Sequence, residues 1–276
     1  MKLCRFVLVL PLCAALLAPG AAFAATPAGV QHELERAIAE PQRSSANVAR
    51  DRNRHPLQTL EFFGVRPDMT VIEVLPGGGW YTEILAPFLR DHGTLIEATP
   101  PSGPMAARFQ AKLDANPAVY GRVHKTPFAP PDSMALGPPN SADVILTFRN
   151  LHDFMYENVH GQETDAILMR FFRSAFRTLK PGGVLGVEAH RAPRDMSPQQ
   201  SFKLGRLPQA FAVAEAKRAG FELAGASEIN ANPKDPGTMP VWFLPPTLAQ
   251  GATDRARYEA IGEADNMELR FVKPKP

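Results

Sequence analysis

The chain has 276 residues, of which 45% are hydrophobic and 21% are charged. This composition supplies enough apolar side chains for a buried core and excludes a disordered chain, a collagen and a polytopic membrane protein. The length fits one large α/β domain better than two small ones. A formal net charge of +2 gives no electrostatic reason to expect nucleic acid or an anionic membrane as a partner.

The first 24 residues have the pattern of a cleavable export signal. Lys2 and Arg5 are basic, residues 6–17 form an apolar stretch too short to span a bilayer easily, and Ala22-Phe23-Ala24 is a small-x-small cleavage site. We therefore expect cleavage after Ala24 and a periplasmic or secreted protein without stable membrane insertion. An uncleaved anchor is the alternative. Both cysteines of the chain lie in this segment, so the mature protein has neither thiol chemistry nor disulfides.

Helices are predicted at the start of the mature chain. Residues 30–39, 45–54 and 56–63 have helical patterns, and Gly64 is placed to end the third helix with a left-handed residue. These elements form a predicted helical cap over residues 25–65.

From residue 66 onward, predicted strands and helices alternate. The strands are expected at residues 70–75, 93–98, 122–126, 143–148, 184–188, 221–229 and 268–273, and the helices at residues 80–89, 105–113, 165–179 and 210–219. Because the strongest strands are continuously apolar, they indicate a parallel sheet buried on both faces. We predict an α/β fold, a doubly wound, Rossmann-like sheet of seven strands in one domain over residues 66–276. Pro87 predicts a kink in its helix, and the Pro-rich residues 232–264 have no predicted organisation.

Ligands of a doubly wound sheet bind beyond the carboxyl ends of its strands. Three glycines, residues 77–79, follow the first strand and would let the backbone approach a ligand at a helix N-terminus. The G-x-G-x-x-G spacing is absent, so a mononucleoside fits better than NAD. Glu97 follows about twenty residues later at the predicted end of the second strand, where a carboxylate can accept ribose hydroxyl hydrogen bonds. A purely structural turn and a solvated acid are the alternatives.

These segments resemble the successive motifs of class I S-adenosylmethionine-dependent methyltransferases. The resemblance covers residues 55–276 and is carried by residues 73–79 (Glu-Val-Leu-Pro-Gly-Gly-Gly), Glu97, residues 143–152, residues 179–183 (Leu-Lys-Pro-Gly-Gly), residues 219–222 and residues 270–273. More narrowly, Arg54-His55-Pro56, residues 76–83 and residues 148–153 resemble a group of exported, methyltransferase-like bacterial proteins.

The resemblance implies a fold of the class I methyltransferase type, S-adenosylmethionine as the cofactor, and roles for individual residues. It places Gly77, Gly78 and Gly79 against the cofactor's amino acid part, Glu73 as a tether of that loop, Glu97 on the ribose, Leu151 at the cofactor, and Asn150 and His152 at the methyl-transfer site. One residue departs from the family pattern. Leu75 stands where the family has the first glycine of its loop.

Methyl transfer to a hydroxyl acceptor needs an in-line approach and a base that takes the proton. His152 is the candidate base, because a histidine with an ordinary pKa near 6.5 accepts a proton at neutral pH, and Asp153 is placed to orient it. We expect His55 to close over the site from the opposite side. A structural histidine is the alternative at both positions. A metal site of His152, Glu188 and His190 is a weaker alternative, and we predict no metal.

Two functions follow from the sequence. One is an S-adenosylmethionine-dependent methyltransferase that acts on an unidentified small or peripheral acceptor outside the cytoplasm. The other is a non-catalytic periplasmic binding or scaffold protein that retains the fold, which Leu75 and the export signal both favour. Trp80 and Tyr81 either stack on an adenine or pack the helix onto the sheet, and core packing is the default expectation. The oligomeric state is not predicted.

Overall fold

The computed structural model describes residues 27–155 and 166–276. The predicted export signal therefore lies outside the described residues. In the described part of the chain, none of the helices combines the length and the apolar character needed to cross a membrane.

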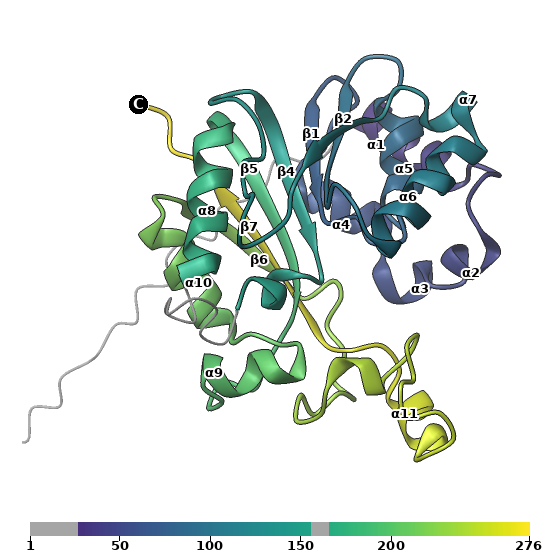
Figure 1. The fold of residues 1–276 in the computed structure, drawn as a ribbon, viewed down its shortest axis with the longest axis vertical. Helices are drawn as coiled ribbons and strands as arrows, with labels where there is room; N and C mark the ends of the chain where they lie inside the picture. Colours follow the sequence, from purple (N-terminus) through teal and green to yellow (C-terminus); the bar gives the residue numbers. More distant parts are fainter. Residues whose placement is uncertain (1–26, 156–165) are drawn as a thin grey trace, which may run out of the picture.

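The described residues form a seven-stranded sheet with the order β3-β2-β1-β4-β5-β7-β6 (Figure 1). Its strands are β1 (Thr70–Val74), β2 (Thr94–Thr99), β3 (His124–Pro127), β4 (Ala142–Phe148), β5 (Leu179–His190), β6 (Glu222–Ser227) and β7 (Asn266–Val272). Strands β1 to β5 are parallel to one another, whereas β7 runs antiparallel to its neighbours β5 and β6. The predicted doubly wound sheet of seven strands is confirmed.

Helices cover both faces of this sheet (Figure 1). One face carries α1 (Ala28–Ile38), α4 (Pro56–Phe63), α5 (Thr82–Leu89), α6 (Pro104–Ala115) and α7 (Pro117–Tyr120), and the other carries α8 (Ala166–Thr178) and α10 (Gln209–Arg218). Alternate side chains of a strand supply the two cores, as the period of two requires. In β1, Val71 packs under α4 and α5, whereas Ile72 and Val74 pack under α8.

Helix α4 is seated closely on the sheet. The ring of Phe63 occupies the space above Gly186 of β5, where a Cβ atom would lie 2.7 Å from the ring. Gly64 ends the helix in the left-handed conformation, with a φ of 74°, as the sequence predicts.

Short elements lie beyond the carboxyl ends of the parallel strands (Figure 1). They are α2 (Ser45–Val48), α3 (Asp51–Arg54), α9 (Pro198–Ser201), α11 (Arg255–Ile261) and the 3₁₀ turns Leu151–Phe154, Phe202–Leu204 and Val241–Phe243. The single helix predicted over residues 45–54 is wrong, because Ala49 and Arg50 separate two turns of helix. Residues 232–264 fold around a small core of their own, in which Leu244 and Tyr258 are buried.

Some predicted boundaries also change. Strand β5 begins at Leu179 and not at residue 184, because Leu179 pairs with Ala142 before the register shifts to Val184 and Val144. Helix α5 begins at Thr82, so Trp80 and Tyr81 belong to the turn that precedes it. Pro87 lies inside α5, which ends two residues later.

Candidate functional site

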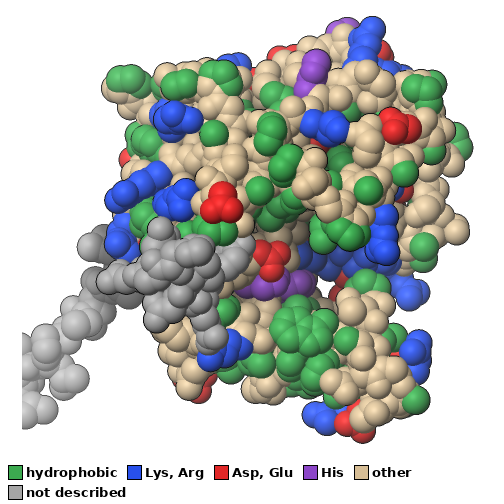
Figure 2. Space-filling view, viewed as in Figure 1, with side chains coloured by type: hydrophobic (Ala, Val, Ile, Leu, Met, Phe, Trp, Pro, Cys, Tyr) green, Lys and Arg blue, Asp and Glu red, His purple; other side chains and the backbone are tan. Residues whose placement is uncertain are grey.

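A cavity of about 1100 Å³ opens at the carboxyl ends of β1 and β4. Figure 2 shows a hollow at the middle of this face, with histidine and acidic side chains in it and basic side chains to one side. Its lining combines the loop after β1, the turn after β4, the short helices α2 and α3, and parts of residues 202–242. This volume is at the upper end of the range for small-molecule sites.

The glycine loop forms one wall of this cavity. A Cβ atom at Gly77 or Gly78 would meet nothing within 4 Å in the described structure, so their backbone is open to a ligand. Gly79 serves a different purpose. Its φ is 74°, and a Cβ atom there would lie 3.0 Å from Phe109 and 3.2 Å from Lys112. Gly79 therefore permits the approach of α6 and does not line the cavity.

Leu75 adopts the backbone conformation that normally calls for glycine. Its φ is 53°, in the left-handed region that branched and bulky side chains rarely occupy. Its amide donates to the carbonyl of Ala98 at 2.8 Å, and its side chain lines the cavity. The loop thus keeps the geometry of a glycine at this position while it carries a leucine, which borders the cavity and packs against the core under α8.

Asn150 ties the ends of β1 and β4 together. Its Nδ2 donates to the carbonyl oxygens of Val74 at 2.9 Å and Leu75 at 3.2 Å, and its Oδ1 accepts from the hydroxyl of Thr147. These bonds use both amide hydrogens. Asn150 lines the cavity, as predicted, but in this structure its amide positions the glycine loop.

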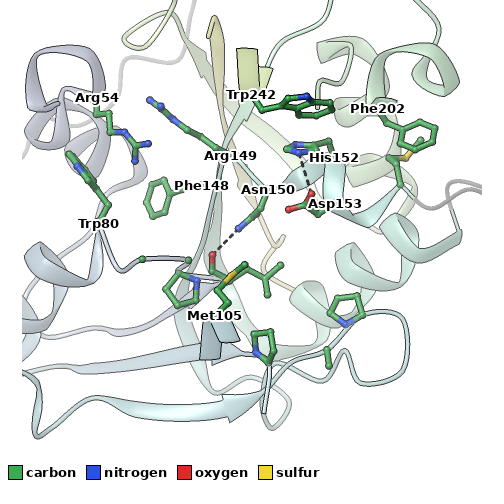
Figure 3. Close-up of a pocket in the computed structure, with 18 of the residues that line it drawn as sticks. Arg54, Trp80, Met105, Phe148, Arg149, Asn150, His152, Asp153, Phe202 and Trp242 are labelled. Atoms are coloured by element: carbon green, nitrogen blue, oxygen red, sulfur yellow. Dashed lines mark hydrogen bonds and ion pairs between the residues drawn. The ribbon is translucent and has the colours of Figure 1, made fainter. Parts of the chain in front are cut away.

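His152 lies on the cavity wall opposite the glycine loop, next to Trp242 and Phe202 (Figure 3). Its Nε2 is 3.2 Å from Oδ1 of Asp153. Burial lowers the pKa of His152 and outweighs the nearby Asp153, which raises it. The imidazole is therefore neutral near pH 7. The predicted proximity of His152 and Asp153 is present.

Glu97 is not at the end of its strand. Strand β2 continues to Thr99, and Glu97 lies opposite Glu73 in the register, under α5 and fully buried. Neither of its carboxyl oxygens accepts a hydrogen bond from an N–H or O–H group of the described residues. Glu97 and Glu73 instead face each other as two buried acids, and Glu73 also accepts from Thr82 at 2.9 Å. Burial raises the pKa of both carboxyl groups, and the closeness of Glu73 raises that of Glu97 further.

Glu97 therefore has no access to the cavity, and its predicted contact with a ribose is not present in this arrangement. Two other predicted residues also lie elsewhere. Leu151 is fully buried in the core under α8. His55 is wrong as a residue that closes over the site, because it sits at the junction of α3 and α4 and its Nδ1 lies 3.0 Å from Oδ1 of Asn230. It lines a separate, smaller cavity.

The basic wall of the cavity has no counterpart among the residues predicted from the sequence. Arg50 and Arg54 come from the α2–α3 segment, and Arg149 comes from the turn after β4 (Figure 3). All three meet the buried carboxylate of Glu263. Arg50 donates to it at 2.8 and 3.0 Å, Arg149 donates through Nη1, and Nε of Arg54 lies 3.6 Å away. Nε of Arg149 also donates to Glu188 at 2.5 Å.

Charge and burial act in opposite directions in this cluster. Burial and the neighbouring Arg149 lower the pKa of Arg54 to about 10. Burial also disfavours the cation at Arg149, but Glu188 and Glu263 outweigh it and raise its pKa. Although burial alone would raise the pKa of Glu263, its arginine partners lower it to about 2. One of the signals was in the sequence, because Arg149 directly precedes the predicted Asn150. Arg54 is also part of the Arg54-His55-Pro56 motif, whereas Arg50 was not marked by any motif.

Aromatic rings complete the wall. The indole Nε1 of Trp80 donates to the carbonyl of Asn47 at 3.1 Å. The guanidinium of Arg54 lies 4.8 Å from the centre of the same ring. Tyr81 is buried, stacks on Phe148, and donates to Glu188 at 3.1 Å. Trp80 and Tyr81 thus join the helical segment to the sheet.

The alternative metal site is not assembled. Glu188 is engaged by Arg149 and Tyr81, and the rings of His152 and His190 have centres 5.9 Å apart. Over residues 27–155 and 166–276, no group of three His, Cys, Asp or Glu side chains is placed to hold a metal ion.

The architecture is similar to that of solved methyltransferases. A methyltransferase from Aquifex aeolicus, described as dependent on S-adenosylmethionine, superimposes with a TM-score of 0.54 over 88% of this chain and 98% of its own, at 15% identity. The chain has the class I methyltransferase fold. The geranyl diphosphate C-methyltransferase of Streptomyces coelicolor A3(2), solved with Mg²⁺, geranyl diphosphate and S-adenosylhomocysteine, gives 0.54 over 86% and 87%, at 14% identity.

The class I methyltransferase fold also occurs in the [4+2]-cyclase SpnF, which superimposes with a TM-score of 0.56 over 90% of this chain and 93% of its own, at 19% identity. The fold therefore does not fix the reaction. No model of a protein family matches the chain, and no curated protein matches it.

Proposed function

We propose that the protein is an S-adenosylmethionine-dependent methyltransferase. The observation that carries the proposal is the cavity of about 1100 Å³ in which an open glycine loop and a neutral histidine face each other at the carboxyl ends of β1 and β4. This is the position at which a doubly wound sheet binds its ligand. The solved methyltransferases of the same fold support the choice of cofactor.

The cofactor fits the glycine loop. Gly77 and Gly78 leave open the space that a Cβ atom would take, and they would hold its amino acid part. When bound, S-adenosylmethionine supplies a methyl group on a positively charged sulfur. Asn150 fixes the loop through its bonds to Val74 and Leu75, so the loop is ordered before a ligand arrives.

His152 would take the proton of the acceptor. The Nε2 atom lies 3.2 Å from Oδ1 of Asp153, and a neutral imidazole keeps one ring nitrogen with a lone pair that can accept the proton. The neutral imidazole that burial favours is the form this step requires. Trp242 and Phe202 line the same part of the cavity and limit the access of water to the base (Figure 3).

Calorimetric titration with S-adenosylmethionine and S-adenosylhomocysteine tests this function, followed by His152→Ala. We expect both ligands to bind, and His152→Ala to keep their affinity while methyl transfer falls by about 100-fold or more. His92→Ala is the matched control, because His92 is exposed and lines a different, small cavity. The absence of binding at millimolar ligand would contradict the proposal.

A second function is favoured by two residues. Leu75 in the glycine loop and the burial of Glu97 both depart from what a cofactor site needs. They support a non-catalytic binding or scaffold protein of the same fold. Such a protein would bind neither cofactor nor product in the titration above, and His152→Ala would change nothing measurable there.

We also propose that the protein acts outside the cytoplasm, in the periplasm or after secretion, on a small or peripheral acceptor and not on nucleic acid. The basic start, the apolar stretch and the Ala22-Phe23-Ala24 site support this location. Sequencing the N-terminus of the protein recovered from the periplasm should give Ala25. Recovery of an intact Met1 from the cytoplasm would contradict it.

A further inference from the structure

The basic wall of the cavity carries one positive charge more than its partners balance. Three guanidinium groups, those of Arg50, Arg54 and Arg149, face two carboxylates, those of Glu188 and Glu263. The side chain of Arg149 is 9% exposed and that of Arg54 11%, so water does not screen this excess as it would on the surface. A buried excess charge is costly unless a ligand or a partner compensates it.

Two guanidinium nitrogens of this wall are buried and lack a hydrogen-bond acceptor among the described residues. Arg149 uses Nε for Glu188 and Nη1 for Glu263, but its buried Nη2 has no acceptor within the described structure. The Nε of Arg54 also lacks a hydrogen bond there, although its guanidinium is held against the ring of Trp80. Arginine donors fixed in this manner match the oxygens of a carboxylate or a phosphate.

The conformation of Arg149 adds to this observation. Its φ of 62° is in the left-handed region, which costs free energy for a residue with a side chain. Its amide donates to the carbonyl of Glu188 at 2.7 Å, so the turn is held from β5. The wall is therefore built in advance from three separate segments, and a ligand would not need to assemble it.

We propose that this arginine wall binds an acidic group, a carboxylate or a phosphate, of the methyl acceptor. The inference rests on the proposed function and names the class of its acceptor. The aromatic rings of Trp80 and Phe148 beside the arginines favour an acceptor with an apolar or aromatic body. In this arrangement the acidic group is held at the arginines, and His152 lies across the cavity from them (Figure 3).

Calorimetry without cofactor tests the wall directly. The probes are 4-hydroxybenzoate and phenyl phosphate as anions, and 4-hydroxybenzamide as the neutral counterpart of the first. We expect the anions to bind at least about tenfold more tightly than the amide. Arg50→Gln and Arg54→Gln should each lower the affinity for the anions by about tenfold and leave the affinity for the amide unchanged. Arg66→Gln is the control, because Arg66 is an exposed partner of Asp68. Circular dichroism and thermal unfolding show that each variant is folded, and either arginine variant suffices for the test.

Three results would overturn the proposal: equal affinity for acid and amide, a preference that survives both arginine substitutions, or no saturable binding of either anion up to about 10 mM. A further arm compares S-adenosylmethionine with its decarboxylated form. If the arginine variants weaken only the former, the wall holds the cofactor's own carboxylate, and the proposal is overturned. Anion binding without any cofactor binding would instead contradict the proposed methyltransferase and leave the anion site supported.

Discussion

At the scale of single residues, Leu75 decides how well the glycine loop can serve a cofactor. Its left-handed backbone and its cavity-facing side chain are two separate penalties. We expect Leu75→Gly to increase the affinity for S-adenosylmethionine by about tenfold, because it removes both. Leu75→Ala separates them, since it removes most of the side chain and keeps the unfavourable φ. Calorimetry of both variants measures the effect, and unchanged affinity in both would show that Leu75 does not obstruct the site.

His152 should control the pH dependence of methyl transfer. The active form is neutral, so activity rises as the pH increases through a pKa below the ordinary 6.5. Asp153 raises this pKa against the effect of burial, and Asp153→Asn should therefore move the acidic limb of the pH–rate profile to lower pH. An acidic limb that lies above pH 6.5, or that moves upward in the variant, would contradict this assignment.

The Glu73–Glu97 pair should make the protein less stable as the pH rises. Burial raises both pKa values in the folded chain, so between about pH 4.5 and the raised values the folded state binds more protons than the unfolded state. The free energy of unfolding thus falls across that range. Glu97→Gln removes one ionisable partner and should raise the free energy of unfolding at pH 8 by about 1–2 kcal/mol. Urea unfolding at pH 5 and pH 8 checks this, and an unaltered pH slope in the variant would count against these raised pKa values.

At the scale of elements, the contact between α4 and β5 sets the height of the helix above the sheet. A methyl group at Gly186 would meet the ring of Phe63 at 2.7 Å and Leu146 at 2.8 Å. Gly186→Ala should lower the free energy of unfolding by about 1–3 kcal/mol. Gly78→Ala is a matched control, since a Cβ atom there has open space. Gly78→Ala should leave the free energy of unfolding nearly unchanged and weaken the binding of the cofactor instead. Equal stability of the two variants would contradict this packing.

The elements were predictable where a pattern repeats along the chain. Strands β1 and β4 were placed within one residue because buried parallel strands are continuously apolar. Residues 232–264 gave no such signal, because their small core draws single residues from turns. The predicted position of Glu97 within its strand was wrong. Strand β2 continues for two residues beyond Glu97, so this side chain is buried against Glu73 and does not reach the ligand site.

Only the part of the site that directly follows the strands of the sheet could be predicted from the sequence. Asn150 and His152 follow a predicted strand directly, so the topology brings them to the glycine loop. The arginine wall joins residues about a hundred positions apart, and a single sequence does not show which of its many arginines meet. His55 was misplaced for the same reason, because its partner Asn230 lies 175 positions away.

At the scale of the whole molecule, Glu263 joins the start, the middle and the end of the chain. It accepts from Arg50 and Arg149, and its pKa is lowered to about 2 by these partners against the effect of burial. Its contribution to stability is complete above the ordinary pKa of 4.5 and is lost as the pH falls through 2.

Glu263→Gln should therefore cost about 3 kcal/mol at pH 7 and flatten the acid limb of stability. Glu259→Gln, which removes one partner of an exposed pair with Arg255, should cost less than about 0.5 kcal/mol. Chemical unfolding of both variants measures the contrast. Equal losses would show that Glu263 is no more than a surface partner.

The two halves of the cavity have different origins. The half with the glycine loop and Asn150 is carried by the carboxyl ends of the strands of the sheet. The half with Arg50 and Trp242 belongs to appended segments, fastened to each other through Glu263. For the proposed methyltransferase, acceptor choice can therefore diversify in evolution while the proposed cofactor side stays constant. Homologues with another acceptor should exchange residues 43–54 and 232–264 together, as a covarying unit, because either segment alone would leave charges without partners.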